Sequence, residues 1–286
     1  MSKNKIVLLL GTTGGVGEAA AKMLMARGYY VITNYRKEEQ KAHLESAGLG
    51  DRFLHLDLSD ITSIENAFAE MQAAGITELD GIINCAAIQI ATPLEEVPMD
   101  EVEYIFRTNV FGTLRVVQLA IPMLRPRKGR IVLCGSLAGS FVMPLTGIYS
   151  ASKYALEAIV DSLRRELYPW GIEVSLIKPG SIDTRMFRSH IDNMKAAYAK
   201  SQEKGSLYVD HYAAHVDSIP KTQSKIMGTT PEEVAAMCLD ALETSRPKPR
   251  YFPSFESKAT RFLTPLLPDR VLDWMSAKFF FPLKKS

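Results

Sequence analysis

Short apolar runs alternate with longer amphipathic segments through the first two-thirds of the chain, which has 286 residues. The apolar runs are rich in β-branched residues and are predicted to be strands, at residues 5–10, 30–33, 52–56, 81–84, 130–134 and 173–177. Between them apolar residues recur at helical spacing, which predicts helices at residues 16–27, 63–74, 99–124 and 149–168. This alternation predicts a three-layer α/β/α domain with a doubly wound parallel sheet and a ligand crevice at the carboxyl ends of its strands.

The alternation stops after Thr184. Residues 185–229 are polar and mixed, and we interpret them as an insertion over the crevice. Helix returns at Thr230, a hydroxyl N-cap that precedes a proline at the first helical position. A last strand is predicted at residues 250–253, before an apolar tail punctuated by prolines. We therefore predict one domain over residues 1–286, divided into a core at 1–184, the insertion at 185–229 and a C-terminal part at 230–286.

The charge balance gives no reason to expect a nucleic-acid partner. The chain carries 34 basic and 32 acidic residues, a net charge of +2, so no general attraction to phosphate polymers is expected. No apolar stretch is long enough to cross a bilayer, so no transmembrane segment is predicted. The apolar run at residues 5–10 is too short for a secretory signal and ends in glycines.

Neither the cysteines nor the histidines have the spacing of a metal site. Cys85, Cys134 and Cys238 are far apart in the sequence, each among apolar neighbours, and we interpret them as buried structural thiols. Three histidines of the insertion match no ligand pattern either: His190, His211 and His215. We predict no metal, and the lack of a disulfide framework predicts a reducing, cytoplasmic location.

A glycine-rich turn follows the first predicted strand, in the stretch LLGTTGGVG at residues 9–17. A helix beginning near Val16 points its unsatisfied N–H groups at this turn, and its dipole favours negative charge there. Glycines let a pyrophosphate approach the backbone, so the context predicts a dinucleotide-binding turn. The glycines fit three spacings: Gly11, Gly15 and Gly17 as G-x-x-x-G-x-G; Gly11, Gly14 and Gly17 as G-x-x-G-x-x-G; Gly15, Gly17 and Ala20 as G-x-G-x-x-A.

The end of the second strand bears on which dinucleotide binds. A site for NAD usually has an acidic residue there, which holds the ribose hydroxyls. This chain has no acid until Glu38 and instead has Arg36 and Lys37, whose cations suit a 2′-phosphate. The pattern favours NADP(H) over NAD(H), and the alternative is a basic turn on a solvated surface.

Tyr149 and Lys153 are four residues apart, so a helix places both on one face. A phenol has a pKa of about 10. A nearby ammonium, together with the positive charge of an oxidised nicotinamide, is expected to bring that pKa into the range of a general acid or base. Ser136 follows the fifth strand, where its hydroxyl can hydrogen-bond a substrate oxygen. The alternative is that Tyr149 caps a helix and Lys153 is solvated.

These residues carry a resemblance to the short-chain dehydrogenases/reductases, over about residues 5–184 and more loosely 230–255. Ser136 lies 13 residues before Tyr149, as in the main short branch of that family. Asn109, in the stretch TNVFG, matches the family's asparagine.

Three further segments match family motifs. Residues 84–87, NCAA, resemble the family's N-N-A-G, with Cys85 and Ala87 in place of the second Asn and the Gly. Asp57 and Leu58 match the pair that lies beside the adenine. Residues 179–184, PGSIDT, fit the segment that holds the carboxamide. Leu10 departs from the threonine that usually precedes the first glycine.

The resemblance implies a Rossmann fold and an NAD(P)-dependent oxidoreductase of alcohols and ketones, and it selects the G-x-x-x-G-x-G spacing. In this scheme Ser136 holds the substrate oxygen and Tyr149 exchanges its proton. Lys153 lowers the tyrosine pKa and binds the nicotinamide ribose, while Asn109 acts through its backbone and a water. The implied cofactor-binding residues are Gly11, Thr12, Thr13, Gly15, Val16, Gly17, Tyr35, Arg36, Asp57, Leu58, Asn84, Ala86, Tyr149, Lys153, Pro179, Gly180, Ile182 and Thr184.

The substrate is less constrained by the sequence. Residues 163–171, LRRELYPWG, resemble members that act on steroids, retinoids and other lipids, so a bulky hydrophobic secondary alcohol or ketone is expected. The insertion at 185–229 is then a substrate lid. Its larger apolar side chains either line a pocket or pack in the core: Met186, Phe187, Tyr198, Tyr208 and Tyr212.

Two other functions are weighed against this one. A regulator that senses NADPH without turnover is disfavoured because such proteins tend to lose the catalytic Tyr or Lys. A nucleotide-sugar epimerase or dehydratase is disfavoured by the Ser–Tyr spacing. The resemblance also implies a homodimer or homotetramer. The tail, with residues 279–281 all Phe and Lys278, Lys284 and Lys285 beside them, is predicted to pack on the domain or a subunit, or to enter a membrane interface.

Overall fold

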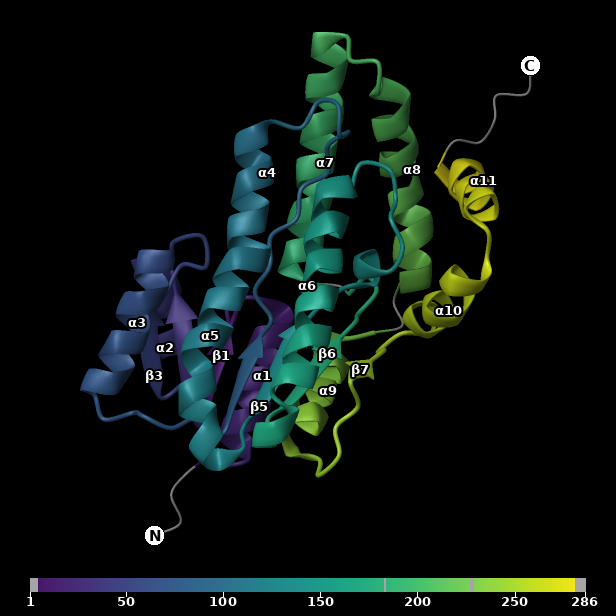
Figure 1. Ribbon diagram of the computed structural model, residues 1–286. Helices are drawn as coiled ribbons and strands as arrows, with labels where there is room; N and C mark the ends of the chain where they lie inside the picture. The colour runs from purple at the N-terminus through teal and green to yellow at the C-terminus, as the bar shows by residue number, and fades with distance from the viewer. Residues whose placement is uncertain (1–4, 183, 227–228, 281–286) are drawn as a thin grey trace.

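The computed structural model describes residues 5–182, 184–226 and 229–280, and shows a sheet between two layers of helices (Figure 1). In this part of the chain seven parallel strands pair in the order β3-β2-β1-β4-β5-β6-β7. They are β1 (Ile6–Leu10), β2 (Tyr30–Tyr35), β3 (Arg52–His55), β4 (Gly81–Asn84), β5 (Arg130–Cys134), β6 (Glu173–Ile177) and β7 (Arg250–Tyr251). The predicted doubly wound α/β sheet is confirmed, and its strand order reverses between β1 and β4.

Each face of the sheet is covered by its own set of helices. One face carries α1 (Gly15–Ala26), α2 (Glu38–Ser46) and α9 (Pro231–Glu243), and the other carries α3 (Ile61–Ala73), α5 (Thr113–Leu124) and α6 (Gly147–Glu166). The remaining helices are α4 (Met99–Phe106), η1 (Arg107–Gly112), η2 (Arg125–Arg127), η3 (Leu137–Gly139), η4 (Tyr168–Trp170), α7 (Arg185–Lys204), α8 (Val209–Ile226), α10 (Phe255–Leu263), η5 (Thr264–Leu266) and α11 (Asp269–Phe280).

The side chains of β1 alternate between the two layers. Leu8 and Leu10 pack with α3, α5 and α6, whereas Val7 and Leu9 pack with α1 and α9. All four side chains are buried. A strand covered on both faces needs apolar residues at every position, which is why this stretch is continuously hydrophobic.

The long helix expected at residues 99–124 changes its winding in the middle. A π-helical segment, η1, joins α4 to α5. Gly112 ends this segment directly against the backbone of Leu58, where a β-carbon would collide with the carbonyl oxygen. Such π-segments often occur at functional positions, and this one contains the buried Asn109.

Five of the described α-helices were not predicted by the hydrophobic pattern: α2, α7 and α8, and α10 and α11 of the tail. The helix α2 buries one side chain, Leu44, so its pattern has almost no apolar periodicity. The insertion forms two helices, α7 and α8, that pack against each other (Figure 1). On α7 the buried residues Ile191, Met194 and Ser201 are spaced three and seven residues apart, a helical face that polar residues interrupt.

The tail forms two helices, α10 and α11, and α11 packs against α8 (Figure 1). Phe281, Lys284 and Lys285 lie outside the described residues, so the contact predicted for the end of the tail stays a prediction. Among the described helices, none combines the length and apolar character that crossing a bilayer requires.

Candidate active site

The glycine turn between β1 and α1 depends on two positions that exclude a side chain. Gly11 has φ +86°, and a β-carbon there would lie 2.6 Å from the Ala86 nitrogen. At Gly17 a β-carbon would collide with the carbonyl oxygen of Gly11. At Gly14 the nearest neighbour of a β-carbon lies at 3.4 Å, an ordinary contact, whereas at Gly15 it meets Pro231 and Thr184 at 3.3 Å. The geometry therefore requires glycine at Gly11 and Gly17, which two of the three spacings share, and it does not separate Gly14 from Gly15.

A cleft of about 370 Å³ opens above this turn, at the carboxyl ends of β1 and β4. The glycine turn and the first residues of α1 form one wall, so the free N–H groups of the helix start face the cleft. The loop after β4, from Cys85 to Gln89, forms another wall. A cleft whose backbone excludes side chains and presents N–H groups fits the pyrophosphate of a dinucleotide.

Buried asparagines hold the walls of the cleft in place. The Asn34 side chain accepts a hydrogen bond from the Gly11 nitrogen at 3.0 Å and donates to the Leu56 carbonyl at 2.9 Å. The Asn84 side chain accepts from the Ala86 nitrogen at 2.9 Å and donates to the Thr113 hydroxyl at 3.0 Å. Asn34 also lines the cleft, whereas Asn84 acts from beneath the loop.

The far end of the cleft carries the residues expected near the adenosine. Arg36 and Asp57 line it. The backbone nitrogen of Arg36 donates to the Gln40 side chain at 2.9 Å, and Gln40 belongs to helix α2, which the sequence did not predict. Asp57 accepts from the nitrogen and hydroxyl of Ser59, both at 2.8 Å. Tyr35 lies aside from the cleft, edge-on to His55.

Four buried threonine hydroxyls have no hydrogen-bond partner among the described residues: those of Thr12, Thr33, Thr108 and Thr229. A buried hydroxyl without a hydrogen-bond partner destabilises the folded state, so a polar ligand atom that reaches it would be bound favourably. Thr108 lines the cleft, and a polar ligand atom there would satisfy it. The described residues thus fit a bound dinucleotide.

Ser136, Tyr149 and Lys153 come together at the carboxyl end of β5. Tyr149 and Lys153 are one turn apart on α6 and are 7% and 3% exposed, so neither is solvated. The Ser136 hydroxyl accepts from the Ala138 nitrogen at 3.1 Å, and it is close enough to the Tyr149 phenol to lower the pKa of that group. The Lys153 ammonium lies 5.7 Å from the centre of the Tyr149 ring and donates to the Cys134 carbonyl at 3.0 Å.

Burial sets the pKa values of this pair. It raises the pKa of Tyr149, and the nearby Ser136 hydroxyl only partly offsets the rise. It also lowers the pKa of Lys153 to about 8, against the opposing charges of Cys134 and Cys85. The expected lowering of the Tyr149 pKa by Lys153 is not found in the chain itself, because desolvation dominates and the ammonium points at a carbonyl. The phenol therefore keeps its proton at neutral pH.

Asn109 ties the π-segment to the cleft and to α6. Its side chain accepts from the Ile88 nitrogen and donates to the Ile88 carbonyl, both at 2.9 Å. It also donates to the Ser152 hydroxyl at 3.1 Å, beside Lys153. Asn109 was expected to act through its backbone and a water. In the structure its side chain also joins the loop at Ile88 to α6 at Ser152.

The segment after β6 closes the cleft from the other side. Thr184 is the N-cap of α7, and its hydroxyl accepts from the Phe187 nitrogen at 3.2 Å. The Pro179 carbonyl accepts from the Leu137 nitrogen at 2.9 Å, which joins this segment to the loop of Ser136. Ile182 packs with the apolar layer of α1 and α9, and Gly180 is half-buried.

The cleft brings together most, but not all, of the residues proposed for the cofactor. It is lined by Gly11, Thr13, Gly15, Val16, Gly17, Arg36, Asp57, Leu58, Ala86 and Thr184. The proposed residues that do not line it are Thr12, Tyr35, Asn84, Asn109, Ser136, Tyr149, Lys153, Pro179, Gly180 and Ile182. Sequence reasoning missed Asn34, Gln40, Thr108, Ser189 and Asn193. Asn34 lies within β2 and Gln40 on α2 just after it, so both belong to a stretch that the sequence already marks, whereas the positions of Ser189 and Asn193 depend on the placement of α7.

The residues named for a substrate pocket differ in their surroundings. Tyr212 is buried, and the Tyr208 hydroxyl donates to Glu95 at 2.6 Å. The Tyr198 hydroxyl accepts from Gln202 at 3.1 Å. The side chain of Met186 lies outside the described residues. From the insertion it is instead polar side chains of α7 that reach the cofactor cleft, Ser189 and Asn193.

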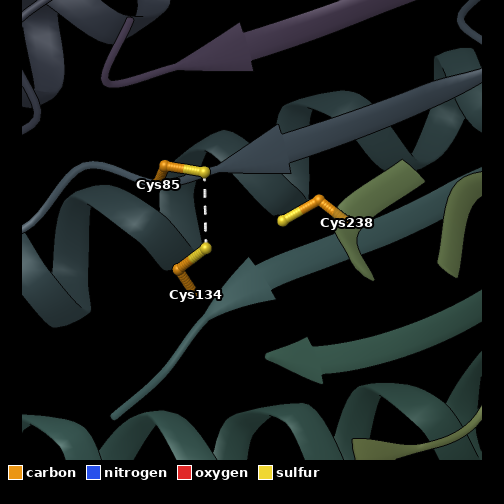
Figure 2. Close-up of side chains that lie close together, drawn as sticks. All are labelled: Cys85, Cys134 and Cys238. Atoms are coloured by element: carbon orange, nitrogen blue, oxygen red, sulfur yellow. Dashed lines mark hydrogen bonds between the residues drawn. The ribbon is translucent and has the colours of Figure 1, made fainter. Parts of the chain in front are cut away.

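The three cysteines, far apart in the sequence, lie together in the fold (Figure 2). The sulfur atoms of Cys85, Cys134 and Cys238 all lie within 4.8 Å of one another. Sequence spacing gave no sign of this group because each sulfur comes from a different element. They are free thiols, as expected.

Comparison with known proteins places this geometry in a family. A family model described as short chain dehydrogenase matches residues 5–195. The chain is a short-chain dehydrogenase/reductase. The "NADPH-dependent 3-dehydrocapnine reductase" of Ornithobacterium rhinotracheale is 30% identical to it over 98% of both chains. The "11-beta-hydroxysteroid dehydrogenase type 2" of Oryctolagus cuniculus is 28% identical over 96% of this chain and 70% of its own.

A solved short-chain dehydrogenase from Burkholderia cenocepacia, in complex with NADP, has the same fold. The two superpose with a TM-score of 0.69 at 20% identity, over 98% of both chains. This short-chain dehydrogenase/reductase is therefore an oxidoreductase enzyme built on a Rossmann fold, and the family resemblance seen in the sequence is confirmed. Enzyme membership overturns the alternative of a regulator without turnover.

Proposed function

We propose that this enzyme transfers a hydride between NADP(H) and a bulky, hydrophobic secondary alcohol or ketone. The observation that carries the proposal is the buried Tyr149 phenol, one helical turn from the buried Lys153, whose ammonium lies 5.7 Å from the centre of the phenol ring. Its neighbour is a glycine-walled cleft that accepts a dinucleotide pyrophosphate. When bound, NADPH supplies the hydride, and the protein supplies the proton and the geometry.

Each residue of the catalytic group has a role that follows from its contacts. The Ser136 hydroxyl holds the substrate oxygen beside the phenol. Tyr149, which holds its proton at neutral pH, donates that proton to the substrate oxygen during ketone reduction. Lys153 supplies positive charge and binds ribose hydroxyls. Asn109 fixes the loop at Ile88 and the position of α6, as a positioning residue.

The choice of NADP(H) is supported by the basic residue at the end of β2. The exposed Arg36 lines the cleft, and Gln40 fixes its backbone. A guanidinium there pairs with a 2′-phosphate in two hydrogen bonds, and an acid that would bind the free ribose hydroxyls is missing between Tyr30 and Lys37. A relative named as NADPH-dependent points the same way.

A hydrophobic substrate is supported by apolar side chains near the start of α6. Val142 and Met143 are 48% and 36% exposed in the loop that follows Ser136, and Leu94 is 65% exposed. Leu94 lies against Gly147, two residues before Tyr149. A hydrogen bond of 2.8 Å from the Thr92 nitrogen to the Leu145 carbonyl joins the two loops. These side chains form an apolar rim beside the phenol, and a relative is named for a hydroxysteroid.

We extend the proposal to the substrate lid, the oligomeric state and the location of the enzyme. We propose α7 and α8 as the lid over the substrate, because Ser189 and Asn193 of α7 already border the cleft. A homo-oligomer and a cytoplasmic location, the latter resting on free thiols, complete the proposal.

The test is a panel of ketones, from small to steroid-sized, assayed with NADPH and with NADH. We expect turnover with NADPH, higher kcat/KM for the larger ketones, and a preference over NADH. Tyr149→Phe should lower kcat by about 10²–10⁴-fold, because the proton donor is lost. Its affinity for NADPH should stay within about threefold of wild type, since the phenol does not line the cleft.

The matched control is Tyr154→Phe, which removes a phenol from the same helix at a side chain that is 44% exposed. It should retain wild-type turnover. Turnover retained by Tyr149→Phe contradicts the assignment. Recycling of the cofactor without net oxidation would indicate the epimerase class instead.

A further inference from the structure

Three elements deliver one sulfur each to the same point beneath the active site. Cys85 follows the last residue of β4, Cys134 is the last residue of β5, and Cys238 lies on α9 (Figure 2). The Cys134 and Cys85 sulfurs are 3.3 Å apart, and all three sulfurs lie within 4.8 Å of one another. The chain has three cysteines in all, so every thiol that it contains is in this cluster.

The surroundings of the cluster are closed on one side and open on the other. Cys238 is fully buried in the apolar layer that α1 and α9 form with the sheet. Cys85 and Cys134 are half-buried, and Cys85 lines the cleft. A small ion can therefore reach the sulfurs from the cleft, while the apolar layer holds the three side chains from behind.

We propose that Cys85, Cys134 and Cys238 bind one thiophilic divalent cation, Zn(II), with a water from the cleft as fourth ligand. Soft thiolate ligands select such ions over Mg(II) and Ca(II). Zinc–sulfur bonds of about 2.3 Å in a tetrahedral site place the sulfurs about 3.8 Å apart. The three sulfurs meet this spacing with side-chain shifts of less than about 1 Å, since their separations run from 3.3 Å to at most 4.8 Å.

Charge balance supports a divalent ion. Binding releases the three thiol protons to solvent and leaves three negative charges. The ion supplies two positive charges, and the Lys153 ammonium, which donates to the Cys134 carbonyl, supplies the third.

The site is tested by metal titration of the reduced, full-length protein after treatment with a chelator. Co(II), the spectroscopic substitute for Zn(II), should produce thiolate-to-cobalt charge-transfer absorption that saturates at one equivalent. Zn(II) should then displace it, and native mass spectrometry should count one ion. Because the chain has no other thiol, this absorption reports on the cluster alone. The readout needs no turnover, so it is independent of the proposed reaction.

Two variants on α9 provide the comparison. Cys238→Ala removes one ligand and should weaken Co(II) binding by about 100-fold or more. Val234→Ala truncates a buried side chain of the same apolar layer, one helical turn earlier, and should keep wild-type affinity. If Cys238→Ala does not fold, Cys85→Ser at the half-buried edge replaces it with the same expected loss.

Three results would overturn the proposal. One is a wild-type protein that shows no charge-transfer absorption with Co(II). Another is binding that Cys238→Ala and Cys85→Ser both leave unchanged, which would place the ion elsewhere on the surface. The third is a reduced protein that takes up no ion but loses two mass units on treatment with peroxide, which would make the cluster a disulfide-forming pair.

Discussion

Gly17 lies where the glycine turn folds back on its own backbone. A β-carbon there would collide with the Gly11 carbonyl, whereas a β-carbon at Gly14 would make an ordinary contact at 3.4 Å. Gly17→Ala should therefore lower the free energy of unfolding by about 1–3 kcal/mol, through displaced backbone. Gly14→Ala, the matched control three residues earlier, should change it by no more than about 0.5 kcal/mol.

Urea denaturation of the two variants measures this difference. Equal losses in both would show that the turn does not distinguish the two positions, and would contradict the steric requirement for glycine at Gly17.

Residue-level chemistry at the site depends on partners as much as on residue type. Asn109 has the identity expected from the resemblance, yet its function follows from the backbone of Ile88 and from Ser152. Lys153 likewise has the expected position on α6, but its ammonium donates to the Cys134 carbonyl. Spacing along one helix predicts which side chains share a face. It does not predict which neighbour from another element receives the hydrogen bond.

At the level of elements, α6 is attached to the end of the sheet by a partly buried network of ion pairs. Glu157 pairs with Lys178 of the segment after β6, and with Arg250 of β7 at 2.9 Å. Arg250 also contacts Asp161 of α6 at 2.9 Å. The Lys178 side chain is 5% exposed, and its ammonium also donates to the Ser140 hydroxyl. This network fixes the helix that carries Tyr149 and Lys153.

Glu157→Gln should destabilise the protein by about 3–5 kcal/mol, because it leaves the buried Lys178 ammonium without a carboxylate. Glu166→Gln is the control, since Glu166 is exposed at the end of the same helix and should change stability by less than about 0.5 kcal/mol. Chemical denaturation at neutral pH compares them. A small effect of Glu157→Gln would mean that Lys178 reaches solvent or another partner.

For the whole molecule, two tyrosines couple stability to alkaline pH. Burial raises the pKa of Tyr29 and of Tyr251 to about 12. The unfolded chain releases these protons near the ordinary value of 10.0. Between pH 10 and 12 the folded protein then holds more protons, so its stability falls as the pH rises. The contribution is fully present below pH 10.

The double variant Tyr29→Phe, Tyr251→Phe should lack this part of the pH dependence. The difference in unfolding free energy between wild type and the double variant is measured from pH 8 to 12. It should be constant up to about pH 10 and then move against the wild type. A difference that stays constant through pH 12 contradicts the raised pKa values.

Much of the fold could be predicted because its strands are continuous apolar runs. The run at β1 is buried on both faces, and the same holds for β4. The helix α2 could not be predicted, since Leu44 is its only buried residue. The helices α7 and α8 pack on each other, so which of their residues are buried depends on the position of the other helix. The hydrophobic pattern of a segment predicts its structure here when that segment belongs to the sheet or packs on it.

Local sequence was enough to predict the α/β alternation, the glycine turn and the grouping of Tyr149 with Lys153 on one helix and of Ser136 near the end of a strand. These features are local: each depends on residues within one turn, one strand or one helix. The tertiary structure alone decided the clamp of Asn109 on Ile88, the raised pKa of Tyr149 and the meeting of three cysteines. These three features depend on burial or on contacts between segments that are far apart in the sequence. Burial and such contacts cannot be predicted from neighbouring residues alone.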